Sequence, residues 1–412
     1  MKPQIRFKTY IGDWESKELY KISKKVTNKN VKKEYNITLT NSAELGIINQ
    51  LEYFDHEITN QSNIAGYYIV ENNDFVYNPR ISSTAPVGPI NRNTLGYTGV
   101  MSPLYYIFRV NGIDENYLSY FFKTRLWHRF MFENGNTGAR FDRLSISDNV
   151  FNLMPISFPN CNYEQKQIAD FFLNVDSLIE ILSKRLSGFN QIKSACLQSL
   201  FPQDGELVPK VRFKGFEGEW KKDRLSKFVG RITRKNKNLE CNLPLTISST
   251  EGLVSQLLYF NNIVAGANLK EYYLIKKGEF AYNKSYSNGY PFGSVKRLDK
   301  YEMGVLSTLY IVFGFKDNSS LVDSDYLATF FSTTLWHHQV SERAEEGARN
   351  HGLLNIGAND FLDINITFPK DLAEQKKISD FFMNLEQQIL NLTQRLEKFK
   401  HIKASCLDKM FV

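Results

Sequence analysis

Apolar residues recur every seven positions along two long stretches of the chain. The first row of apolar residues in each stretch comprises Ile168, Val175, Leu182, Phe189 and Cys196, and then Ile378, Leu385, Leu392, Phe399 and Cys406. A second row comprises Phe172, Ile179, Leu186 and Leu200, and then Phe382, Ile389, Leu396 and Met410. A sustained heptad repeat predicts a helix that packs against another helix. Each helix should run for roughly 39 residues, or about 58 Å.

The two stretches are copies of one sequence. Residues 164–201 begin EQKQIADFF and residues 374–411 begin EQKKISDFF, and the copies align without a gap. The repeat extends towards the N-terminus, because RFKTYIGDW returns as RFKGFEGEW, FVYN as FAYN, and GVMSPLYYIF as GVLSTLYIVF. A repeat of this length predicts two tandem halves, each a mixed domain followed by one long helix.

The connection between the halves predicts how the helices pack. The linker from Leu200 to Pro209 is short, so the second domain begins where the first helix ends. The second helix can then run back along the first as an antiparallel coiled coil, in which each buried Leu, Ile or Phe contributes about 1.5–3 kcal/mol. We interpret Cys196 and Cys406 as small core residues of this seam.

We therefore expect an α+β fold. Two pseudo-two-fold-related mixed α/β domains should be separated by the helix pair, because strand-like runs alternate with Gly, Asn and Pro turns. Short helices are expected at residues 116–130 and 325–340. The predicted boundaries are 1–160 for the first domain, 161–205 for the central helix, 206–371 for the second domain and 372–412 for the C-terminal helix.

The composition limits the classes of protein to which this chain can belong. A chain of 412 residues with 42 % apolar residues can bury two cores. The sequence contains no apolar run of membrane-spanning length and no apolar signal sequence, which favours a cytoplasmic location. None of the four cysteines lies in a C-x-x-C pair, so no zinc site is predicted. The net charge of +7 permits a polyanionic partner without requiring one.

Basic and polar loops supply the candidate DNA contacts. The basic loops at equivalent places in the two halves contain Lys25, Lys29, Arg231, Arg234 and Lys235. Such loops contact phosphates in many DNA-binding proteins, although a solvated loop has the same composition. The loops that diverge most contain Asn78, Arg80, Ser83, Arg92, Asn283, Lys284, Tyr286, Asn288 and Lys296. These side chains can pair with base edges in the major groove, and the alternative is ordinary drift of a surface loop.

A Gly-Ala-Arg sequence occurs in both halves and places Arg140 and Arg349 after a flexible turn. These arginines are further candidates for DNA binding, and structural ion pairs are the alternative.

No phosphate-binding loop, zinc-hydrolase motif or methyltransferase motif is present in the sequence. The chain is therefore interpreted as a binding protein without a visible catalytic centre. A stand-alone DNA-modifying enzyme with an unrecognised active site is the rival interpretation. A coiled-coil scaffold that binds no DNA would leave the repeated basic loops unexplained.

The order of these motifs resembles the specificity subunit of type I restriction–modification enzymes. The resemblance rests on the RFK…W openings, the GVLSTLYIVF strand and the FP…EQKKISDFF start of the helix, and it covers the whole chain. It implies that each domain recognises one part of a bipartite site in double-stranded DNA. It also implies that two methyltransferase subunits dock on the helices, and that restriction subunits join the complex.

The resemblance further implies that this chain binds no cofactor itself. S-adenosylmethionine, ATP and Mg would be held by the partner subunits. Because the apolar stripe is wider than a two-helix seam requires, we expect the methyltransferase subunits to contact Phe172, Ile179, Leu186, Phe382, Ile389 and Leu396. We interpret the doubled EQK phrase as the start of two equivalent docking sites.

Overall fold

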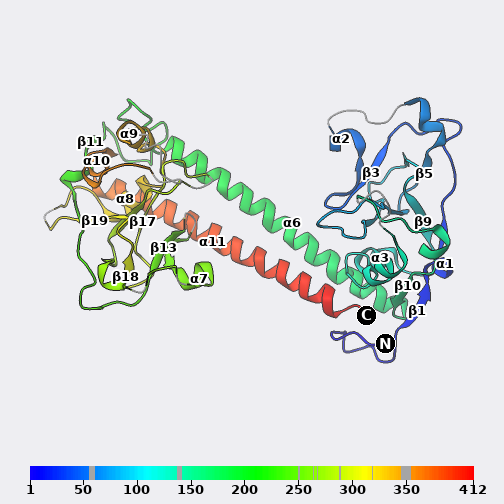
Figure 1. Cartoon of the computed structure of the whole chain (residues 1–412). Coiled ribbons are helices and arrows are strands. Elements are labelled where there is room, and N and C mark those ends of the chain that lie inside the picture. The colour runs from blue at the N-terminus through cyan, green and yellow to red at the C-terminus, as the bar shows by residue number, and fades with distance from the viewer. Residues whose placement is uncertain are drawn as a thin grey trace. The chain divides into compact units, whose positions relative to one another are not determined.

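The computed structural model describes residues 1–54, 61–136, 142–248, 251–262, 264–266, 268–286, 289–317, 319–344 and 354–412. The chain divides into two compact units (Figure 1). Unit 1 comprises Met1–Ser183 and Gln394–Val412, and unit 2 comprises Lys184–Thr393. Each unit therefore includes a part of both long helices. The domain boundaries expected from the sequence stay predictions.

Unit 1 consists of short strands and helices followed by the start of a long helix. In chain order its elements are β1 (Glu15–Glu18), α1 (Leu19–Ile22), β2 (Ser23–Lys25), β3 (Leu39–Ser42), β4 (Gly46–Asn49), α2 (Gln50–Phe54), η1 (Gln61–Gly66), β5 (Tyr68–Val70), β6 (Phe75–Tyr77), β7 (Ile90–Arg92), β8 (Gly99–Met101), β9 (Tyr106–Val110), α3 (Glu115–Phe121), α4 (His128–Asn134), α5 (Asp148–Phe151), β10 (Pro155–Phe158) and α6 (Asn162–Ser199). The strands form a four-stranded sheet in the order β2-β9-β6-β7 and three pairs, β1-β10, β3-β4 and β5-β8.

Unit 2 repeats this arrangement. Its elements are β11 (Lys221–Arg224), η2 (Leu225–Lys227), β12 (Val229–Arg231), β13 (Leu245–Ser248), β14 (Gly252–Ser255), α7 (Gln256–Phe260), η3 (Leu269–Glu271), β15 (Tyr273–Lys276), β16 (Phe280–Asn283), β17 (Ser294–Arg297), β18 (Met303–Leu306), β19 (Ile311–Phe315), α8 (Ser324–Phe330), α9 (His337–Arg343), α10 (Ala358–Leu362), β20 (Asn365–Phe368) and α11 (Leu372–Lys409). The four-stranded sheet has the order β12-β19-β16-β17, and the pairs are β11-β20, β13-β14 and β15-β18. The predicted α+β class and the internal repeat are confirmed.

The short helix expected at residues 116–130 is two helices, α3 and α4. Between them the Thr124 hydroxyl donates to the carbonyl of Phe121 and accepts from the amide of Leu126. The buried Trp127 indole donates to the carbonyl of Phe122. Thr333 makes the equivalent bonds between α8 and α9 in unit 2. Because hydroxyl bonds to nearby backbone compete with helical bonds, the first helix ends before this threonine in both units.

The long helices have the expected length, because α6 and α11 each contain 38 residues. Within unit 1, Phe172 contacts Phe411 at 5.8 Å between ring centroids, and Lys403 pairs with Asp176 at 2.5 Å. Within unit 2, the Lys193 ammonium lies 2.6 Å from the Glu386 carboxylate. The numbering of the contacting residues rises along α6 while it falls along α11. The helix segments in unit 1 therefore run antiparallel, as predicted.

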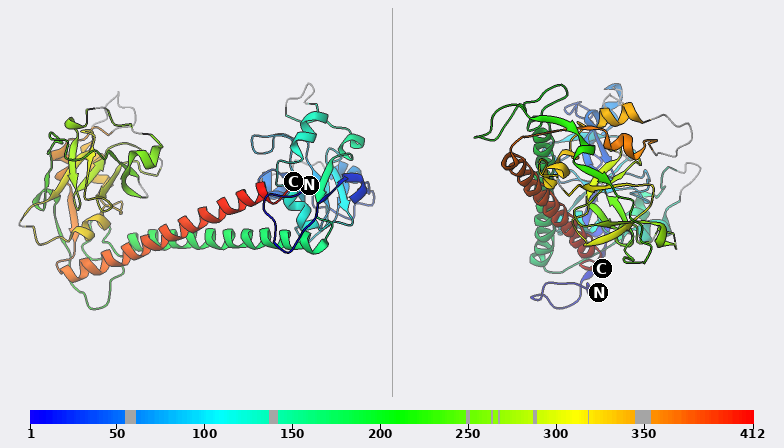
Figure 2. Two further views of the ribbon diagram at one scale, coloured as in Figure 1. Left: turned by 90° about the horizontal axis from the view of Figure 1, so that it is seen from below. Right: turned by 90° about the vertical axis from the view of Figure 1, so that its left-hand side faces the viewer.

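Each core is completed by the end of a long helix. Met410 and Phe411, directly after α11, are buried in the core of unit 1, and Leu200 and Phe201, directly after α6, are buried in that of unit 2. In unit 1 the N-terminal segment lies beside the C-terminal end, and the amide of Ile5 donates to the carbonyl of Lys409 (Figure 2).

The repeated RFK…W and EQK phrases form one structural anchor in each unit. In unit 1 the Arg6 guanidinium donates two bonds to the buried Glu164 carboxylate, at 2.7 and 2.8 Å. The side chain of the next residue, Gln165, accepts from the amide of Asp114, just before α3. Arg212 binds Glu374 in unit 2 at the same two distances. Because Glu164 and Glu374 are each only 1 % exposed, the first residue of the phrase belongs to the core of each unit, and the expectation that the phrase begins a docking site stays a prediction.

Candidate nucleic-acid interface

Unit 1 has a concave polar face that gathers several of the predicted DNA-binding residues. It is a cavity of about 690 Å³ between β3, the loop after β6 and the turn after β8. Its lining includes Asn78, Arg80, Ser83, Thr40, Leu104, Tyr105 and Arg143. Hydroxyl, amide and guanidinium groups at one surface are the donors and acceptors that read base edges and phosphates.

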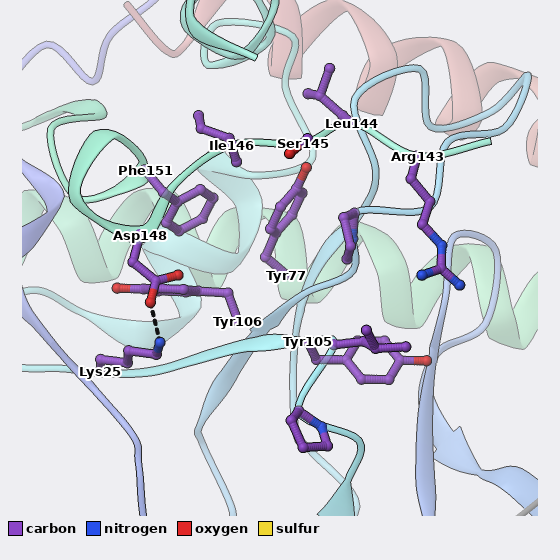
Figure 3. Close-up of a pocket in the computed structure, with 13 residues that line it drawn as sticks. Lys25, Tyr77, Tyr105, Tyr106, Arg143, Leu144, Ser145, Ile146, Asp148 and Phe151 are labelled. Carbon is purple, nitrogen blue, oxygen red and sulfur yellow. Dashed lines mark hydrogen bonds and ion pairs between the residues drawn. The ribbon is translucent and has the colours of Figure 1, made fainter. Parts of the chain in front are cut away.

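Figure 3 shows a smaller cavity, of about 260 Å³. It continues this face, because Leu104, Tyr105 and Arg143 line both cavities. At its other end Lys25 forms an ion pair with Asp148 and lies 5.1 Å from the ring centroid of Tyr106. Burial raises the pKa of Tyr106 to about 12. Because Asp148 compensates the charge of Lys25 within unit 1, Lys25 is a weaker candidate for a phosphate contact.

The two arginines of this face carry less compensated charges. Arg80 and Arg143 approach the carboxylate of Asp142 only at 3.9 and 4.0 Å, and all three side chains reach solvent. Exposed pairs at such distances contribute little, so both guanidinium groups can turn towards a phosphate or a base. Lys29 is exposed and forms no ion pair with any residue that the structure describes. These three cations are therefore the most available candidates for phosphate or base contacts in unit 1.

The basic loop of unit 2 is less available than its sequence suggests. Arg234 forms an ion pair with Glu279 at 2.8 Å. The Lys235 ammonium donates to the carbonyl of Glu271 at 2.5 Å and lies 4.6 Å from the ring centroid of Tyr273. Arg231 is exposed, and its guanidinium lies 3.4 Å from the Tyr273 hydroxyl. Arg231 is thus the most accessible cation of the predicted set in this loop.

Asn78 and Asn283 hold the backbone of the reading loops. The Asn78 side chain accepts from the amide of Arg80 at 3.0 Å and donates to the carbonyl of Asn41 at 2.9 Å. The Asn283 side chain accepts in the same way from the amide of Ser285, at 3.0 Å. Bonds of this kind fix turns. We therefore reinterpret both asparagines as positioning residues.

Two predicted base contacts face the interior of their units. The Arg92 guanidinium donates to Asn116 at 2.5 Å near the start of α3, and burial lowers its pKa. Burial also lowers the pKa of half-buried Lys296, whose charged neighbours Glu386 and Lys193 lie on the long helices. Arg92 and Lys296 are partly buried beside helices, which makes them weaker candidates for base contacts, and the expectation that they read bases stays a prediction.

Lys284 and Tyr286 are the remaining described candidates of unit 2. The Lys284 ammonium is partly buried, and its pKa is lowered by burial and by the positive charge of Arg231. Tyr286 is 63 % exposed and can reach a partner. Asn288, Arg140 and Arg349 lie outside the described residues.

Arg143, Tyr105 and Thr40 line the concave face but were not among the candidates predicted from the sequence. The signal for Tyr105 was present, because GVMSPLYYIF and GVLSTLYIVF repeat the Ser-x-Leu-Tyr turn. Arg143 carries no such signal, because it reaches the cavity only through the backbone pairing of Arg80 with Arg143.

Three of the six predicted partner contacts are buried within the units. Phe172 is fully buried against Tyr120, with ring centroids 4.9 Å apart, and Phe382 packs on Phe201 at 6.1 Å. Leu396 is also buried. These residues cannot form a docking surface, because the apolar row continues into the cores. Ile179, Leu186 and Ile389 are half-buried and stay predictions. The exposed apolar residues of the long helices include Leu173, Leu178, Ile181, Ile192, Met383 and Leu390.

The surroundings of Cys196 and Cys406 fit the predicted structural role of these two residues. Cys196 and Cys406 pack beside the cores, and burial raises the pKa of both thiols, which disfavours the reactive thiolate. The described residues contain no group of three or more His, Cys, Asp or Glu side chains that could hold a metal ion. Among them, no helix combines the length and apolar character needed to cross a bilayer.

Comparison with known proteins supports the fold. No protein-family model and no curated protein matches the sequence. A chain of the type I R-M system, from a structure on its complex assembly and conformational transition, matches at 12 % identity, covering 97 % of each chain, with a TM-score of 0.48. The HsdS subunit from Thermoanaerobacter tengcongensis matches at 13 % identity, covering 97 % of this chain and 96 % of that one, with a TM-score of 0.44. The S subunit of a type I restriction-modification system from M. genitalium matches at 12 % identity over 100 % of this chain and 99 % of that one, with a TM-score of 0.60. This chain therefore has the fold of a type I specificity subunit over its whole length.

Proposed function

We propose that this chain is the sequence-specific DNA-binding subunit of a type I restriction–modification complex. The full-length fold likeness to the M. genitalium S subunit carries the proposal. The concave face of unit 1 adds independent support, because Arg80 and Arg143 are weakly compensated there and stand among hydroxyl and amide groups. Such a surface suits the phosphates and base edges of duplex DNA.

Each unit reads one part of a bipartite target. The two units share one order of strands and helices, so each can present the same face to a duplex. Pro79 in unit 1 and Lys284 in unit 2 occupy equivalent places, because the carbonyl of each accepts a hydrogen bond from the amide of a leucine, Leu144 and Leu354 respectively. The side chains at this place therefore differ between the units. Two different side-chain sets on one frame suit two different half-sites.

Two methyltransferase subunits dock on the long helices and carry the chemistry. The exposed apolar residues Leu173, Leu178 and Ile181 of α6, with Met383 and Leu390 of α11, replace the buried phenylalanines as contacts. S-adenosylmethionine is held by these partners, and restriction subunits supply the sites for ATP and Mg. The chain itself is non-catalytic and acts in the cytoplasm.

The test separates the DNA-recognition subunit from a stand-alone enzyme. The purified chain, alone and with a methyltransferase subunit from the same organism, is incubated with labelled S-adenosylmethionine and a random DNA library. We expect methylation only in the mixture, at one bipartite sequence. Methyl transfer by the chain alone would support the enzyme. Methylation without sequence preference would contradict recognition by this chain.

A second test addresses the docking surface. Ile181→Asp introduces a charge on an exposed position of α6 and should abolish binding of the methyltransferase subunit. Ile11→Asp places the same charge on the N-terminal segment, where Ile11 is 92 % exposed. That control should assemble normally, and equal behaviour of the two variants would contradict docking on the helices.

A further inference from the structure

One turn is repeated in the two units with the same exposed side chain. The turn between β8 and β9 contains Ser102, Leu104 and Tyr105, and the turn between β18 and β19 contains Ser307, Leu309 and Tyr310. Leu104 is 62 % exposed and Leu309 is 59 % exposed. A single exposed leucine is ordinary on a protein surface. An exposed leucine at the equivalent position of both units indicates that both leucines contact the same kind of partner.

The backbone of the turn is held in place in both units. In unit 1 the amide of Tyr105 donates to the carbonyl of Ser102 at 3.1 Å, and the amide of Leu104 lies 3.4 Å from the Ser102 hydroxyl. In unit 2 the corresponding bonds to Ser307 measure 3.1 and 3.3 Å. A leucine on such a turn loses little backbone entropy when it meets a partner.

A pair of hydroxyl groups fixes the tyrosine that follows each leucine. The Tyr105 hydroxyl lies 3.1 Å from the Thr40 hydroxyl on β3. The Tyr310 hydroxyl lies 3.4 Å from the Thr246 hydroxyl on β13. These bonds tie the turn to the neighbouring strand pair, so the leucine projects from a rigid support in both units.

The surroundings of Leu104 indicate the chemistry of its partner. Leu104 lines both cavities of the concave face, where Arg80 and Arg143 provide cations and Tyr105 provides a hydroxyl. The partner must therefore offer anionic and hydrogen-bonding groups with a small apolar group among them. The major groove of duplex DNA does so, because the C5-methyl group of thymine lies beside the donors and acceptors of the base edges.

We propose that Leu104 and Leu309 each contact the C5-methyl group of a thymine, one in each half of the target. This inference rests on the proposed DNA recognition and deepens it by naming a residue that reads a base. The leucine distinguishes thymine from cytosine, which lacks the methyl group. Arg80 and Arg143 hold the adjoining phosphates or bases of the first half.

The test uses the complex of the full chain with its methyltransferase subunits. The target is first selected from a random library, and each thymine is then replaced by uracil, which lacks only the methyl group. We expect one thymine in each half whose replacement weakens binding about fourfold, as for the loss of one buried methyl contact. Leu104→Ala should bind the thymine target about fourfold more weakly and should no longer sense uracil in the first half. Ile11→Ala is the matched control and should bind and sense uracil as the parent chain does.

Three outcomes would overturn the inference. In the first, no uracil replacement weakens binding by the parent chain. In the second, Leu104→Ala still distinguishes uracil from thymine in the first half. In the third, Leu104→Ala assembles less well with the methyltransferase subunit while its DNA preference is unchanged. The uracil series on the parent chain needs no variant, so a folding defect cannot mask the result. Failure of the library to yield any preferred sequence would instead contradict the proposed function itself.

Discussion

The anchors of the two units are alike, whereas their candidate reading faces differ. Arg6 meets Glu164 and Arg212 meets Glu374 with the same pair of distances. On the reading face, by contrast, Lys25 is compensated by Asp148 in unit 1. In unit 2 no such compensation is found for Lys284 among the described residues, and its pKa is lowered by burial and by the like charge of Arg231.

This difference follows from burial. Replacing one member of a buried ion pair leaves an uncompensated charge in the core, so the anchors change little. Exposed side chains can be exchanged at small cost to stability, usually within about 0.5 kcal/mol. Duplicated units can therefore acquire different faces while they retain one frame.

The largest expected effect comes from breaking the anchors. Glu164→Ala and Glu374→Ala each leave an arginine unpaired and should lower the free energy of unfolding by about 3–5 kcal/mol. Hydrogen exchange of peptides from each unit measures the loss separately. Glu164→Ala should cost more, because the Trp14 indole also donates to Glu164, whereas the buried Trp220 indole has no partner among the described residues. Arg224→Ala, which breaks an exposed pair with Asp363, is the control. Tolerance of the substitution in one unit alone would show that the anchors are not equivalent.

A smaller effect is expected at the glycines that face the two asparagines. A Cβ atom at Gly88 would lie 2.1 Å from the Asn78 carbonyl oxygen, and one at Gly293 would lie 2.0 Å from that of Asn283. Gly88→Ala and Gly293→Ala should each cost more than about 2 kcal/mol, because the left-handed backbone alone costs about 1–2 kcal/mol. Gly96→Ala has a similar φ of +80° and nothing within 4 Å, so it measures the backbone cost by itself. Thermal unfolding compares the three variants, and equal losses would refute the close approach.

The next effect concerns DNA recognition by unit 1. Arg143→Ala and Arg80→Ala should each weaken binding to the selected target by about 1–3 kcal/mol if they read bases, and should relax the preference in the first half only. Competition binding with targets mutated in one half measures this. Lys17→Ala removes a cation that pairs with Glu15 outside the concave face and should change neither half. Relaxation of both halves would contradict independent reading.

The smallest effect distinguishes the two lysines that the sequence places at equivalent positions. Lys29→Ala should lower the slope of log affinity against log salt by about one, as for a lost phosphate contact. Lys235→Ala should lower it less, because the ammonium already donates to the carbonyl of Glu271. Binding titrations over a range of salt concentrations measure both slopes. An equal change for the two lysines would restore the equivalence suggested by the sequence.

The frame was more predictable than the candidate site. Heptad spacing is a local property, so the positions of α6 and α11 follow from rows such as Ile168, Val175 and Leu182. The accessibility of Arg92 or Lys296 depends on the elements that pack against their strands, which no local pattern records. Both carry the residue type of a DNA contact, yet they face helices.

The sequence by itself determined the duplication, the two long helices and the mixed class of the domains, because periodicity and repetition are written along the chain. Tertiary structure alone decided which members of these patterns are exposed. Phe172 and Leu173 are neighbours on α6, yet one completes the core of unit 1 and the other reaches solvent. Likewise, Arg143 joins Arg80 at one cavity only because distant backbone segments pair. Burial and electrostatic pairing are properties of three-dimensional neighbours, and these neighbours exist only once the chain has folded.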